Sequence, residues 1–564
     1  MDSERGWKTA FSQLAELGEK LVATRSRLEL TRLVAELLQG LEPAEVLPAV
    51  RLILGQPFPA WEPRTLNLSW QAVSRVLNDL TAASEQEWRA AAAEAVDGGE
   101  AVQKLLERAR RIPILPPPLS LGEVYATLVQ IAESVGTGSR QKKESLLQGL
   151  LLRATPLEAK YLVKNIIAEM RYGVNEGLML EAIAAAASAK PALVKRAHMF
   201  WGDLSEVAEV ALREGGAGLK KATVRLFHPL QPMLAQTVET MAEALGEQGS
   251  GQASAALEYK LDGARVQIHK RGEKVCIYSR QLAEVTPSLP EIVDWVRGGV
   301  AASDAILEGE AIAVDSEGRP LPFQQVMRRF GRVHDVAQMV QDMPVALYLF
   351  DLLYADGKGY VDVPYAERWE ALGLIAPRLK RAPRLVPTSL EEAERFAQEA
   401  YEAGHEGVMV KQLSSQYTPG LRGRHWLKLK HTLSLDLVIV AADWGYGRRH
   451  RWLSNYHLAA WDEEKGHFLE VGKTFKGLTD AEFEDMTQRL LTLEKARRGG
   501  TVWVEPRIVV EVLYNELQES PRYEAGLALR FARIGRLRED KGPHQADTIQ
   551  TLRRLYARQH KGRV

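Results

Sequence analysis

The sequence predicts a multidomain protein with an all-α N-terminal domain, a central α+β domain and a small C-terminal β-barrel. Through about residue 225, Ala, Leu, Glu and Arg are abundant and apolar positions recur three and four apart, as in helices. From about residue 236, short apolar strands alternate with helical segments, and beyond residue 433 strand-like segments dominate. A chain of 564 residues is also too long for one core. We therefore expect domains at 1–225, 226–433 and 434–564.

Two helix starts in the N-terminal part are well marked. Ser120 precedes Glu123 by three residues after a proline-rich link, and Thr155 is followed by Pro156 and Glu158. Both patterns predict an N-cap, the second with a capping-box glutamate and a proline at the first helical position. Residues 214–235 then lose helical periodicity and gain glycine and proline, which predicts a linker.

Composition narrows the class of protein. Lys plus Arg and Asp plus Glu both number 73, so net charge indicates no partner. The single cysteine, Cys276, excludes an internal disulfide framework and a multi-cysteine zinc site. The N-terminus has no signal-peptide pattern, and no apolar run is long enough to span a bilayer, so we expect a cytoplasmic protein without a membrane partner.

The segment EYKLDGARVQIHK, residues 258–270, contains a Lys-Arg pair around Asp262-Gly263. An Asp-Gly pair between alternating segments predicts a two-residue β-hairpin, in which Lys260 would face Arg265. Like charges opposite each other are destabilising, so an anion such as phosphate would explain the pair. A surface hairpin with a solvated polar side is the alternative.

Two further strands carry candidate side chains. In residues 305–315 the period of two places Glu308 and Glu310 on one face, either as ordinary ion-paired acids or as functional carboxylates. Residues 345–357 are almost continuously apolar, and Tyr348, Phe350 and Tyr354 are expected on one face. These aromatic rings fit a core, but a ring at the edge of a site can also stack on a purine.

Acidic and basic residues mark the last two strands of the central domain. Glu406 begins the apolar strand 406–413, where its carboxylate could reach a divalent cation bound to phosphate. In residues 422–430, Trp426, Lys428 and Lys430 alternate with leucines, which also fits a basic surface strand. Taken together, the five segments supply the nucleophile, cations, carboxylates and aromatic surface that nucleotidyl transfer requires.

The ordered segments resemble the motif series of ATP-dependent DNA ligases: KLDGAR (260–265), SR (279–280), EGE (308–310), FD (350–351), EGVMVK (406–411) and WLKLK (426–430). The resemblance extends to the helical DNA-binding domain of the archaeal and eukaryotic replicative ligases at 153–177, and to their OB-fold at 472–480 and 528–541. Two positions depart from the family pattern. Glu308 stands where aspartate is common, and Ala532 stands where proline is common.

The resemblance implies a nick-sealing enzyme that uses ATP and Mg²⁺. Lys260 would attack the α-phosphate of ATP, and AMP would pass to the 5′-phosphate of a nick before the 3′-hydroxyl displaces it. Cations near Lys260 would favour the neutral amine that attack requires. Further implied roles are Glu258 at the adenine edge, Phe350 on adenine, Arg265 and Arg280 at ribose and phosphates, Arg422 and Lys428 at phosphates, Glu310 at ribose or metal, and Glu406 at metal.

The C-terminal domain contains two basic groups. Arg530, Arg533, Arg536, Arg538 and Lys541 would be a solvated tail if they had no function, whereas the resemblance implies that they orient pyrophosphate when the OB-fold closes. Residues 448–451 (Arg-Arg-His-Arg) and the helical domain would contact duplex backbone. The expected partner is nicked double-stranded DNA, bound by a monomer that a sliding clamp could recruit during replication, repair or recombination.

Other classes of protein fit the sequence less well. An RNA ligase or a capping guanylyltransferase would share the K-x-D-G core, but the helical N-terminal domain argues against both. A non-catalytic DNA-binding scaffold could keep the fold, although the complete set of nucleophile, acids and cations argues against it. An NAD-dependent ligase is disfavoured because one cysteine cannot build its four-cysteine zinc site.

Overall fold

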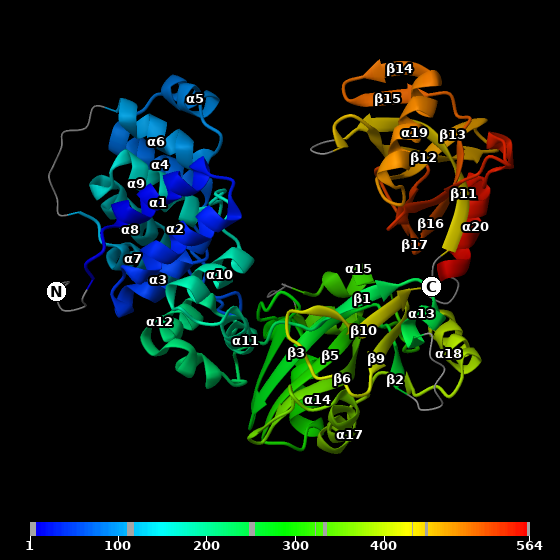
Figure 1. Cartoon of the computed structure of the whole chain (residues 1–564), viewed down its shortest axis with the longest axis horizontal. Coiled ribbons are helices and arrows are strands. Elements are labelled where there is room, and N and C mark those ends of the chain that lie inside the picture. The colour runs from blue at the N-terminus through cyan, green and yellow to red at the C-terminus, as the bar shows by residue number, and fades with distance from the viewer. Residues whose placement is uncertain are drawn as a thin grey trace.

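The computed structural model describes residues 7–109, 118–246, 254–321, 323–330, 336–430, 433–445 and 449–560. Figure 1 shows a helical N-terminal part and a β-rich C-terminal part on either side of a central part built from sheets and helices. The predicted fold class is therefore confirmed. Among the described residues, no helix is long and apolar enough to cross a membrane.

The N-terminal domain is entirely helical over the residues described. Its helices are α1 (Phe11–Ala23), α2 (Arg27–Gln39), α3 (Pro43–Leu54), α4 (Trp70–Thr81), α5 (Glu85–Ala93), α6 (Gly98–Arg108), α7 (Leu121–Glu133), α8 (Ser139–Arg153), α9 (Pro156–Ile166), α10 (Glu176–Ala186), α11 (Pro191–Trp201) and α12 (Leu204–Lys220). Both predicted starts are confirmed, since the side chain of Ser120 caps α7 and Thr155 forms a capping box with Glu158 on α9.

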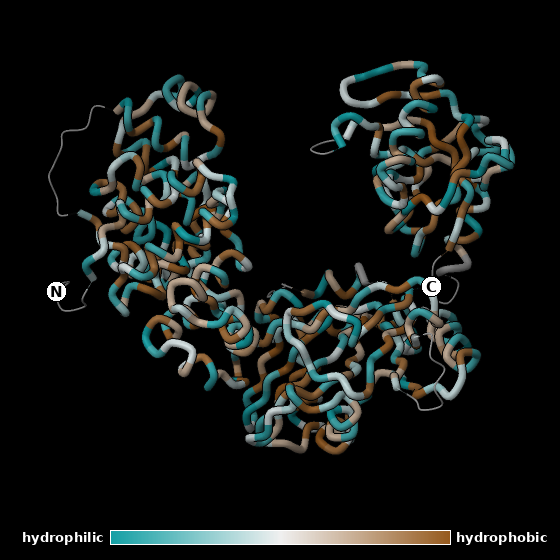
Figure 2. Tube along the Cα trace, in the orientation of Figure 1, coloured by the Kyte–Doolittle hydropathy of each residue, from teal (hydrophilic) through white to brown (hydrophobic). Residues whose placement is uncertain are grey.

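The apolar faces of these helices meet in one core. Buried side chains such as Leu14, Val34, Leu162 and Ile183 belong to it, and Figure 2 shows apolar and polar segments interleaved along the helices. The predicted linker begins too early, because α12 continues to Lys220 with only a local break at Gly215. Gly215 explains the difference. Glycine tolerates the positive φ found here, so the helix has a local break at this residue and continues beyond it.

The central domain consists of two five-stranded sheets flanked by helices. One sheet has the order β1-β10-β9-β2-β8 and the other β4-β3-β5-β6-β7. The strands are β1 (Leu234–Val238), β2 (Ala255–Tyr259), β3 (Ala264–Arg271), β4 (Lys274–Ser279), β5 (Asp304–Ala313), β6 (Val345–Ala355), β7 (Lys358–Gly359), β8 (Arg384–Leu385), β9 (Gly407–Gln412) and β10 (Arg422–Lys430). The helices are α13 (Met241–Leu245), α14 (Pro290–Gly299), α15 (Phe323–Met327), α16 (Val336–Asp342), α17 (Tyr365–Ile375) and α18 (Leu390–Glu402).

The hairpin predicted at Asp262-Gly263 is wrong. Strand β2 pairs with β8 and β9, whereas β3 pairs with β4 and β5, so the chain passes from one sheet to the other at this point. Glycine is needed at position 263 for space. A Cβ there would lie 2.5 Å from the carbonyl oxygen of Ala311 and 2.6 Å from a side-chain carbon of Ile312. Lys260 and Arg265 thus belong to different sheets.

Strand β6 departs from regular alternation at Phe350. Opposite Glu308 and Gly309 of β5, its pairing skips this residue, which makes Phe350 the extra residue of a β-bulge. Phe350 packs against the apolar clusters of both the helical domain and the second central sheet, and Tyr354 packs against the first of these. Tyr348 and Tyr354 stand opposite Glu310 and Ile306, which share one face of β5, so these two rings lie on the predicted common face.

A fully buried ion pair lies behind this bulge. Arg368 on α17 donates to both carboxylate oxygens of Asp351 on β6, at 2.7 and 3.0 Å, and neither side chain is exposed. Arg368 also donates to the carbonyls of Val363 and Ser415, which ties three segments together.

We predict that Arg368→Met lowers the free energy of unfolding by about 3–5 kcal/mol, because it leaves the buried carboxylate of Asp351 without a partner. Urea unfolding at neutral pH measures this loss. The double variant Arg368→Met/Asp351→Leu is the control and should recover part of it, because no buried charge remains; a loss equal to or larger than that of the single variant would contradict the explanation.

The C-terminal domain is a β domain with two helices. It comprises β11 (Leu433–Trp444), β12 (Leu453–Asp462), β13 (His467–Thr474), α19 (Asp480–Thr492), β14 (Glu494–Arg498), β15 (Thr501–Val504), β16 (Val509–Tyr514), β17 (Glu516–Glu519), β18 (Leu527–Arg530), β19 (Arg533–Leu537) and α20 (Ile549–His560). Strand β11 is central, because it pairs with β12, β15 and β16.

The basic segment 530–541 is not a solvated tail. Arg530 ends β18 and Arg533 begins β19, whose pairing with β16 makes it part of the main C-terminal sheet. The cations of the segment are matched by carboxylates in the folded chain: Arg530 by Glu516, Arg533 by Glu239, Arg536 by Glu511, and both Arg538 and Lys541 by Asp436. The pair Arg533–Glu239 also links this domain to the central one.

Candidate active site

A cavity of about 540 Å³ lies between the two central sheets. Every site residue expected from the sequence lines it: Glu258, Lys260, Arg265, Arg280, Glu310, Phe350, Glu406, Arg422 and Lys428. The side chains come from both sheets, and the C-terminal domain adds Arg530 and Phe531. Residues distant in sequence are therefore brought to a single pocket.

Lys260 lies at the end of β2, where the first sheet opens into the cavity. Its Nζ is 2.6 Å from Oε2 of Glu406, and Nζ of Lys430 is 2.7 Å from the same oxygen. The backbone reinforces this contact, since the Glu406 N–H donates to the carbonyl of Lys260 and the Lys260 N–H donates to that of Gly407. Gly407 has φ +138°, and a Cβ would lie 2.3 Å from the Leu429 carbonyl oxygen, so only glycine fits beside this pair.

The cations around Lys260 affect one another. Burial lowers the pKa of Lys428, and the charges of Lys260, Lys430, Arg422 and Arg280 lower it further. For Glu406, burial alone would raise the pKa, but Lys260 and Lys430 outweigh burial and hold it well below its usual range. Cations thus gather near Lys260 as expected, but the charged group that Lys260 contacts directly is the carboxylate of Glu406.

The pKa of Glu310 on β5 is shifted in the opposite direction from that of Glu406. Burial raises its pKa to about 7; Lys260 and Arg265 lower it, whereas Glu406 and Asp262 add to the rise. A carboxyl group in this state is half protonated near neutral pH and would gain most from an added cation.

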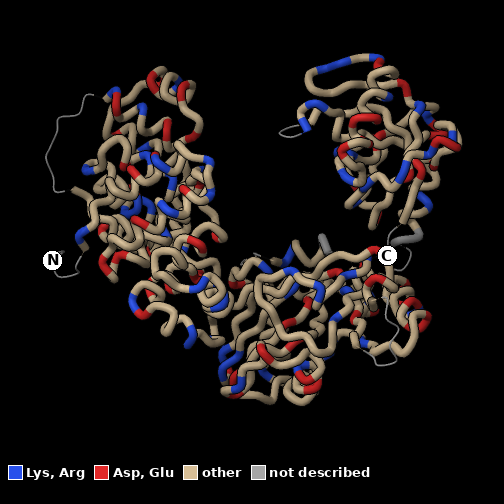
Figure 3. The backbone as a smooth tube through the Cα atoms, viewed as in Figure 1, with Lys and Arg blue, Asp and Glu red and all other residues tan. Residues whose placement is uncertain are grey.

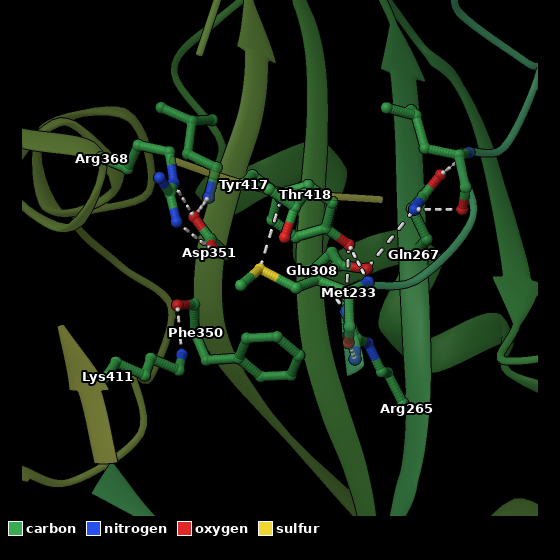
Figure 4. A network of polar contacts seen from close by, with 12 residues as sticks. Met233, Arg265, Gln267, Glu308, Phe350, Asp351, Arg368, Lys411, Tyr417 and Thr418 are labelled. Atoms are coloured by element: carbon green, nitrogen blue, oxygen red, sulfur yellow. Dashed lines mark hydrogen bonds and ion pairs between the residues drawn. The ribbon is translucent and has the colours of Figure 1, made fainter. Parts of the chain in front are cut away.

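Arg265 begins a network of buried polar groups (Figure 4). Its Nη2 is 2.6 Å from Oε2 of Glu308 and 3.0 Å from the hydroxyl of Tyr417, and its Nη1 donates to the carbonyl of Met233 at 2.6 Å. Arg265 therefore has its own carboxylate, Glu308, and no anion between it and Lys260 is required. Its buried Nε has no hydrogen-bond partner among the described residues, which leaves one donor for a ligand.

Glu258 and Phe350 line the cavity where both contact the buried side chain of Lys411. Oε2 of Glu258 is 2.6 Å from Nζ of Lys411, and the Tyr365 hydroxyl donates to Oε1. Lys411 lies against the rings of Phe350, Tyr365 and Trp426 at 4.3–4.9 Å. Burial lowers the pKa of Lys411, and Glu258 opposes that change. The lysine thus holds both the carboxylate and the aromatic ring in place.

Sequence reasoning missed several lining residues. Lys411 is one of them, although a lysine in an otherwise apolar strand is a usable signal for a buried ion pair. Met233, Leu234 and Ala235 line the cavity from the linker and the start of β1, a segment expected only to connect domains. No local pattern distinguishes these three apolar residues from other connecting residues.

The pocket can be compared with what a divalent cation needs. Among the described residues, no group of three or more His, Cys, Asp or Glu side chains could hold a metal ion by itself. Glu310 and Glu406 nevertheless line the same cavity, and the charge of Glu406 contributes to the raised pKa of Glu310. A hard cation that takes one or two carboxylates and completes its shell with phosphate oxygens and water fits this donor set.

The fold and the pocket define a nucleotidyltransferase with a helical domain before its catalytic domain and a β domain after it. Three family models match the chain in this order: DNA ligase N terminus over residues 10–184, ATP dependent DNA ligase domain over 232–430, and ATP dependent DNA ligase C terminal region over 449–541. The chain belongs to the ATP-dependent DNA ligases.

Relatives match over nearly the full length. DNA ligase 1 of Korarchaeum cryptofilum is 47% identical over 97% of this chain and 98% of its own length. The DNA ligase of Thermococcus fumicolans is 42% identical over 98% of this chain and 99% of its own. The solved structure Pmar-Lig_PreS3 has a TM-score of 0.51 and 17% identity over 93% of this chain and 99% of that one, which shows a shared fold.

Proposed function

We propose that this enzyme seals nicks in duplex DNA through three displacements at phosphorus that use the pocket around Lys260. The neutral Nζ of Lys260 attacks the α-phosphate of ATP, and pyrophosphate leaves as the P–N bond forms. A 5′-phosphate oxygen of the nick then displaces the lysine and takes the AMP. Finally the 3′-hydroxyl attacks that 5′-phosphate, AMP leaves, and the backbone is joined.

The convergence of Lys260 with four other cationic side chains, Arg280, Arg422, Lys428 and Lys430, carries this proposal. Phosphate oxygens gain charge as bonds to phosphorus break, and fixed cations in a buried pocket stabilise that charge. The Lys260–Glu406 contact must be released before the amine can attack, because an ammonium has no free electron pair. Triphosphate charge among the cations would compete with Glu406 for them.

The other residues predicted to bind the nucleotide have proposed contacts with ATP. Phe350 provides the ring for adenine, and Glu258 uses oxygen lone pairs that Lys411 and Tyr365 leave available to accept from the adenine edge. Arg265, with its unpartnered Nε, faces the ribose and phosphates together with Arg280. Arg422 and Lys428 hold phosphates, and Arg530, which also lines the pocket, contacts the pyrophosphate.

Glu310 and Glu406 are the proposed ligands of Mg²⁺. When bound, the metal would supply positive charge against the phosphate oxygens of ATP. The half-protonated state of Glu310 supports this assignment, because a carboxyl group whose pKa is raised to about 7 is stabilised by a cation.

The raised pKa of Glu310 predicts a pH-dependent metal requirement. Mg²⁺ must displace the proton of Glu310 below about pH 7, so the apparent affinity should fall up to about tenfold per unit as pH decreases from 7 and level off above it. Mg²⁺ titrations of the self-adenylation rate between pH 6 and 8 measure this dependence.

The matched control is Glu310→Gln, which cannot titrate. It should bind Mg²⁺ more weakly at every pH and lose most of the slope, so that only the titration of ATP remains. An equal slope in both proteins would remove Glu310 from the set of ligands.

DNA contacts are proposed for the helical domain and for the basic surface of the C-terminal domain. Figure 3 shows Lys and Arg at the tip formed by β14 and β15, where Lys495, Arg497 and Arg498 are exposed. In the basic group 448–451, Arg451 is exposed and Arg449 donates to the carbonyl of Phe475, whereas Arg448 lies outside the described residues. We propose that a monomer binds nicked duplex through phosphate contacts; recruitment by a sliding clamp stays a prediction.

Backbone binding predicts a steep salt dependence. The logarithm of the affinity for nicked duplex should fall linearly with the logarithm of salt concentration, and Lys495→Ala/Arg498→Ala should reduce the slope by about 1–2 without changing preference among DNA sequences. Fluorescence anisotropy across a salt series measures both slopes. If the two slopes are identical, the β14–β15 tip does not touch DNA.

Incubation with α-labelled ATP and Mg²⁺, followed by addition of nicked duplex DNA, tests the proposed function directly. We expect one labelled adenylate per protein, discharged as the nick is sealed. Label that forms but never reaches DNA would point to an RNA substrate, and absence of label with DNA binding intact would contradict the catalytic role of the pocket.

A further inference from the structure

The linker between the helical domain and the central domain is fixed along one strand. It covers the residues between the end of α12 at Lys220 and the start of β1 at Leu234. Leu226, Leu230 and Met233 are buried in the same apolar cluster as the helical domain, and Met233 also lines the nucleotide cavity. The segment that carries the helical domain therefore ends as a wall of the catalytic pocket.

Three alternate residues of β3 hold this linker from one face of the strand: Arg265, Gln267 and His269. They contact the backbone of Met233, Leu230 and Phe227, at intervals of three residues along the linker. Since side chains on one face of a strand recur every two residues, the strand presents a regular row of polar groups to a segment that forms no sheet pairing with it. We call this row the β3 rail.

His269 forms the outer end of the β3 rail. Its Nδ1 accepts from the backbone N–H of Phe227 at 2.8 Å, and its Nε2 lies 2.9 Å from Oε1 of Gln267. Burial lowers the pKa of His269 to about 3, and the nearby charge of His228 lowers it further, so the ring is neutral and can accept at Nδ1 while donating at Nε2. The hydroxyl of Tyr278 donates to the carbonyl of Phe227, which fixes this residue from both sides at φ +66°.

Gln267 forms the middle of the rail. Its Oε1 accepts from the N–H of Leu230 at 2.7 Å, and its Nε2 donates to the carbonyl of the same residue at 3.2 Å. The amide thus takes the place of a partner strand for one linker residue. The same Nε2 lies 3.4 Å from Oε1 of Glu308, whose other oxygen binds Arg265.

Arg265 forms the inner end. Its Nη1 donates to the carbonyl of Met233, while the N–H of Met233 donates to the Tyr417 hydroxyl that Arg265 also contacts. Figure 4 shows Met233, Arg265, Gln267, Glu308 and Tyr417 joined in one network. Since these groups are buried, each would cost free energy if left unpaired, so the linker and the guanidinium of Arg265 are expected to keep or lose their positions together.

We propose that Gln267 and His269 are positioning residues for ATP use: by seating the interdomain linker on the β3 rail, they fix the linker wall of the pocket and the guanidinium of Arg265. This proposal rests on the role of Arg265 at the nucleotide proposed above. It couples the nucleotide pocket to the helical domain, because the segment that enters the pocket wall is the one that leaves α12. Loss of these hydrogen bonds to the linker should therefore weaken ATP binding more than it slows the attack of Lys260 on the α-phosphate.

Gln267→Met tests the proposal with little change in volume, since it removes every hydrogen bond of the amide. His269→Gln is the conservative partner, because its amide can still bridge Phe227 and Gln267. The matched control is Lys270→Met on the opposite face of β3, where a buried ammonium donates to the carbonyls of Ala302 and Ser303, away from the linker. Urea unfolding identifies the folded variants and their losses of stability.

Single-turnover self-adenylation with α-labelled ATP supplies the decisive measurement. For Gln267→Met we expect the half-saturating ATP concentration to rise about tenfold or more, a maximal rate within a few-fold of wild type, and faster amide exchange over residues 226–233. His269→Gln should stay within a few-fold of wild type, and Lys270→Met should lose stability without a change in ATP dependence.

Two results would overturn the proposal. In the first, Gln267→Met has an unchanged ATP dependence despite faster amide exchange in the linker, which would make the rail a structural feature alone. In the second, Lys270→Met raises the ATP requirement as much as Gln267→Met does. Failure of the proposed function is distinguishable from both, since wild type itself would then take no label. If Gln267→Met does not fold, His269→Ala compared with His269→Gln provides the same contrast.

Discussion

Lys260→Arg should abolish self-adenylation, with no labelled protein above background after incubation with α-labelled ATP and Mg²⁺. The substitution keeps a positive charge beside Glu406 but replaces an amine with a guanidinium, which stays protonated and is a poor nucleophile. An effect through charge or folding would leave a measurable rate. We expect a decrease of at least about 10⁵-fold, comparable with removal of other covalent nucleophiles.

The third chemical step distinguishes a role of Lys260 as nucleophile from a role in maintaining the structure of the site. Once AMP is on the 5′-phosphate of a nick, Lys260 no longer forms a bond, so Lys260→Arg should still seal a nick that carries a preformed 5′-adenylate. Sealing of that substrate with no self-adenylation would assign the amine to the first two steps. Retained adenylate on Lys260→Arg would show that another residue is the nucleophile.

The side chains of the pocket could be predicted because most of them lie on strands with clear alternation. Lys428 and Lys430 on β10 share a face opposite Leu427 and Leu429, and the leucines pack in an apolar cluster as expected. Glu406 stands directly before β9, as its sequence position indicated. Motif resemblance then suggested a common site, which strand alternation alone could not do.

The connection between Lys260 and Arg265 could not be predicted from local signals. Asp-Gly is a strong hairpin signal, yet the pairing of β2 with β9 joins residues about 150 positions apart, and such non-local pairing overrides the preference of a turn. The glycine is explained by the close approach of β5, which only the folded chain reveals.

The buried polar network around Arg265 could not be predicted from the sequence for a related reason. Gln267 and His269 follow Arg265 at the spacing of one strand face, but a polar face reads the same whether it meets solvent or a linker. The linker residues that complete the network are apolar and contribute backbone groups, which carry no sequence signal. The wrong hairpin prediction at Asp262-Gly263 has a similar origin, since it lies where the chain passes from one sheet to the other.

Glu406→Gln should slow self-adenylation by about 10²–10³-fold, the usual effect of removing one fixed electrostatic group from a catalytic site. The carboxylate is the shared partner of Lys260 and Lys430, at 2.6 and 2.7 Å, and the proposed ligand of Mg²⁺. Without its charge, the two ammonium groups repel each other and the orientation of the nucleophile is lost. The substitution also removes a constraint on the amine, but we expect the loss of orientation and metal binding to dominate.

Rates of self-adenylation across a range of Mg²⁺ concentrations distinguish the two effects. Glu406→Gln should need more Mg²⁺ and remain slow at saturation, because metal binding and lysine orientation fail separately. Asp304→Asn removes a carboxylate paired with Arg271 at the far end of β5 and is the matched control, expected to retain the wild-type rate. If Glu406→Gln were as fast as wild type, or faster, at every Mg²⁺ concentration, the carboxylate would act only as a restraint on Lys260, and the metal would have to be held by Glu310 and the substrate alone.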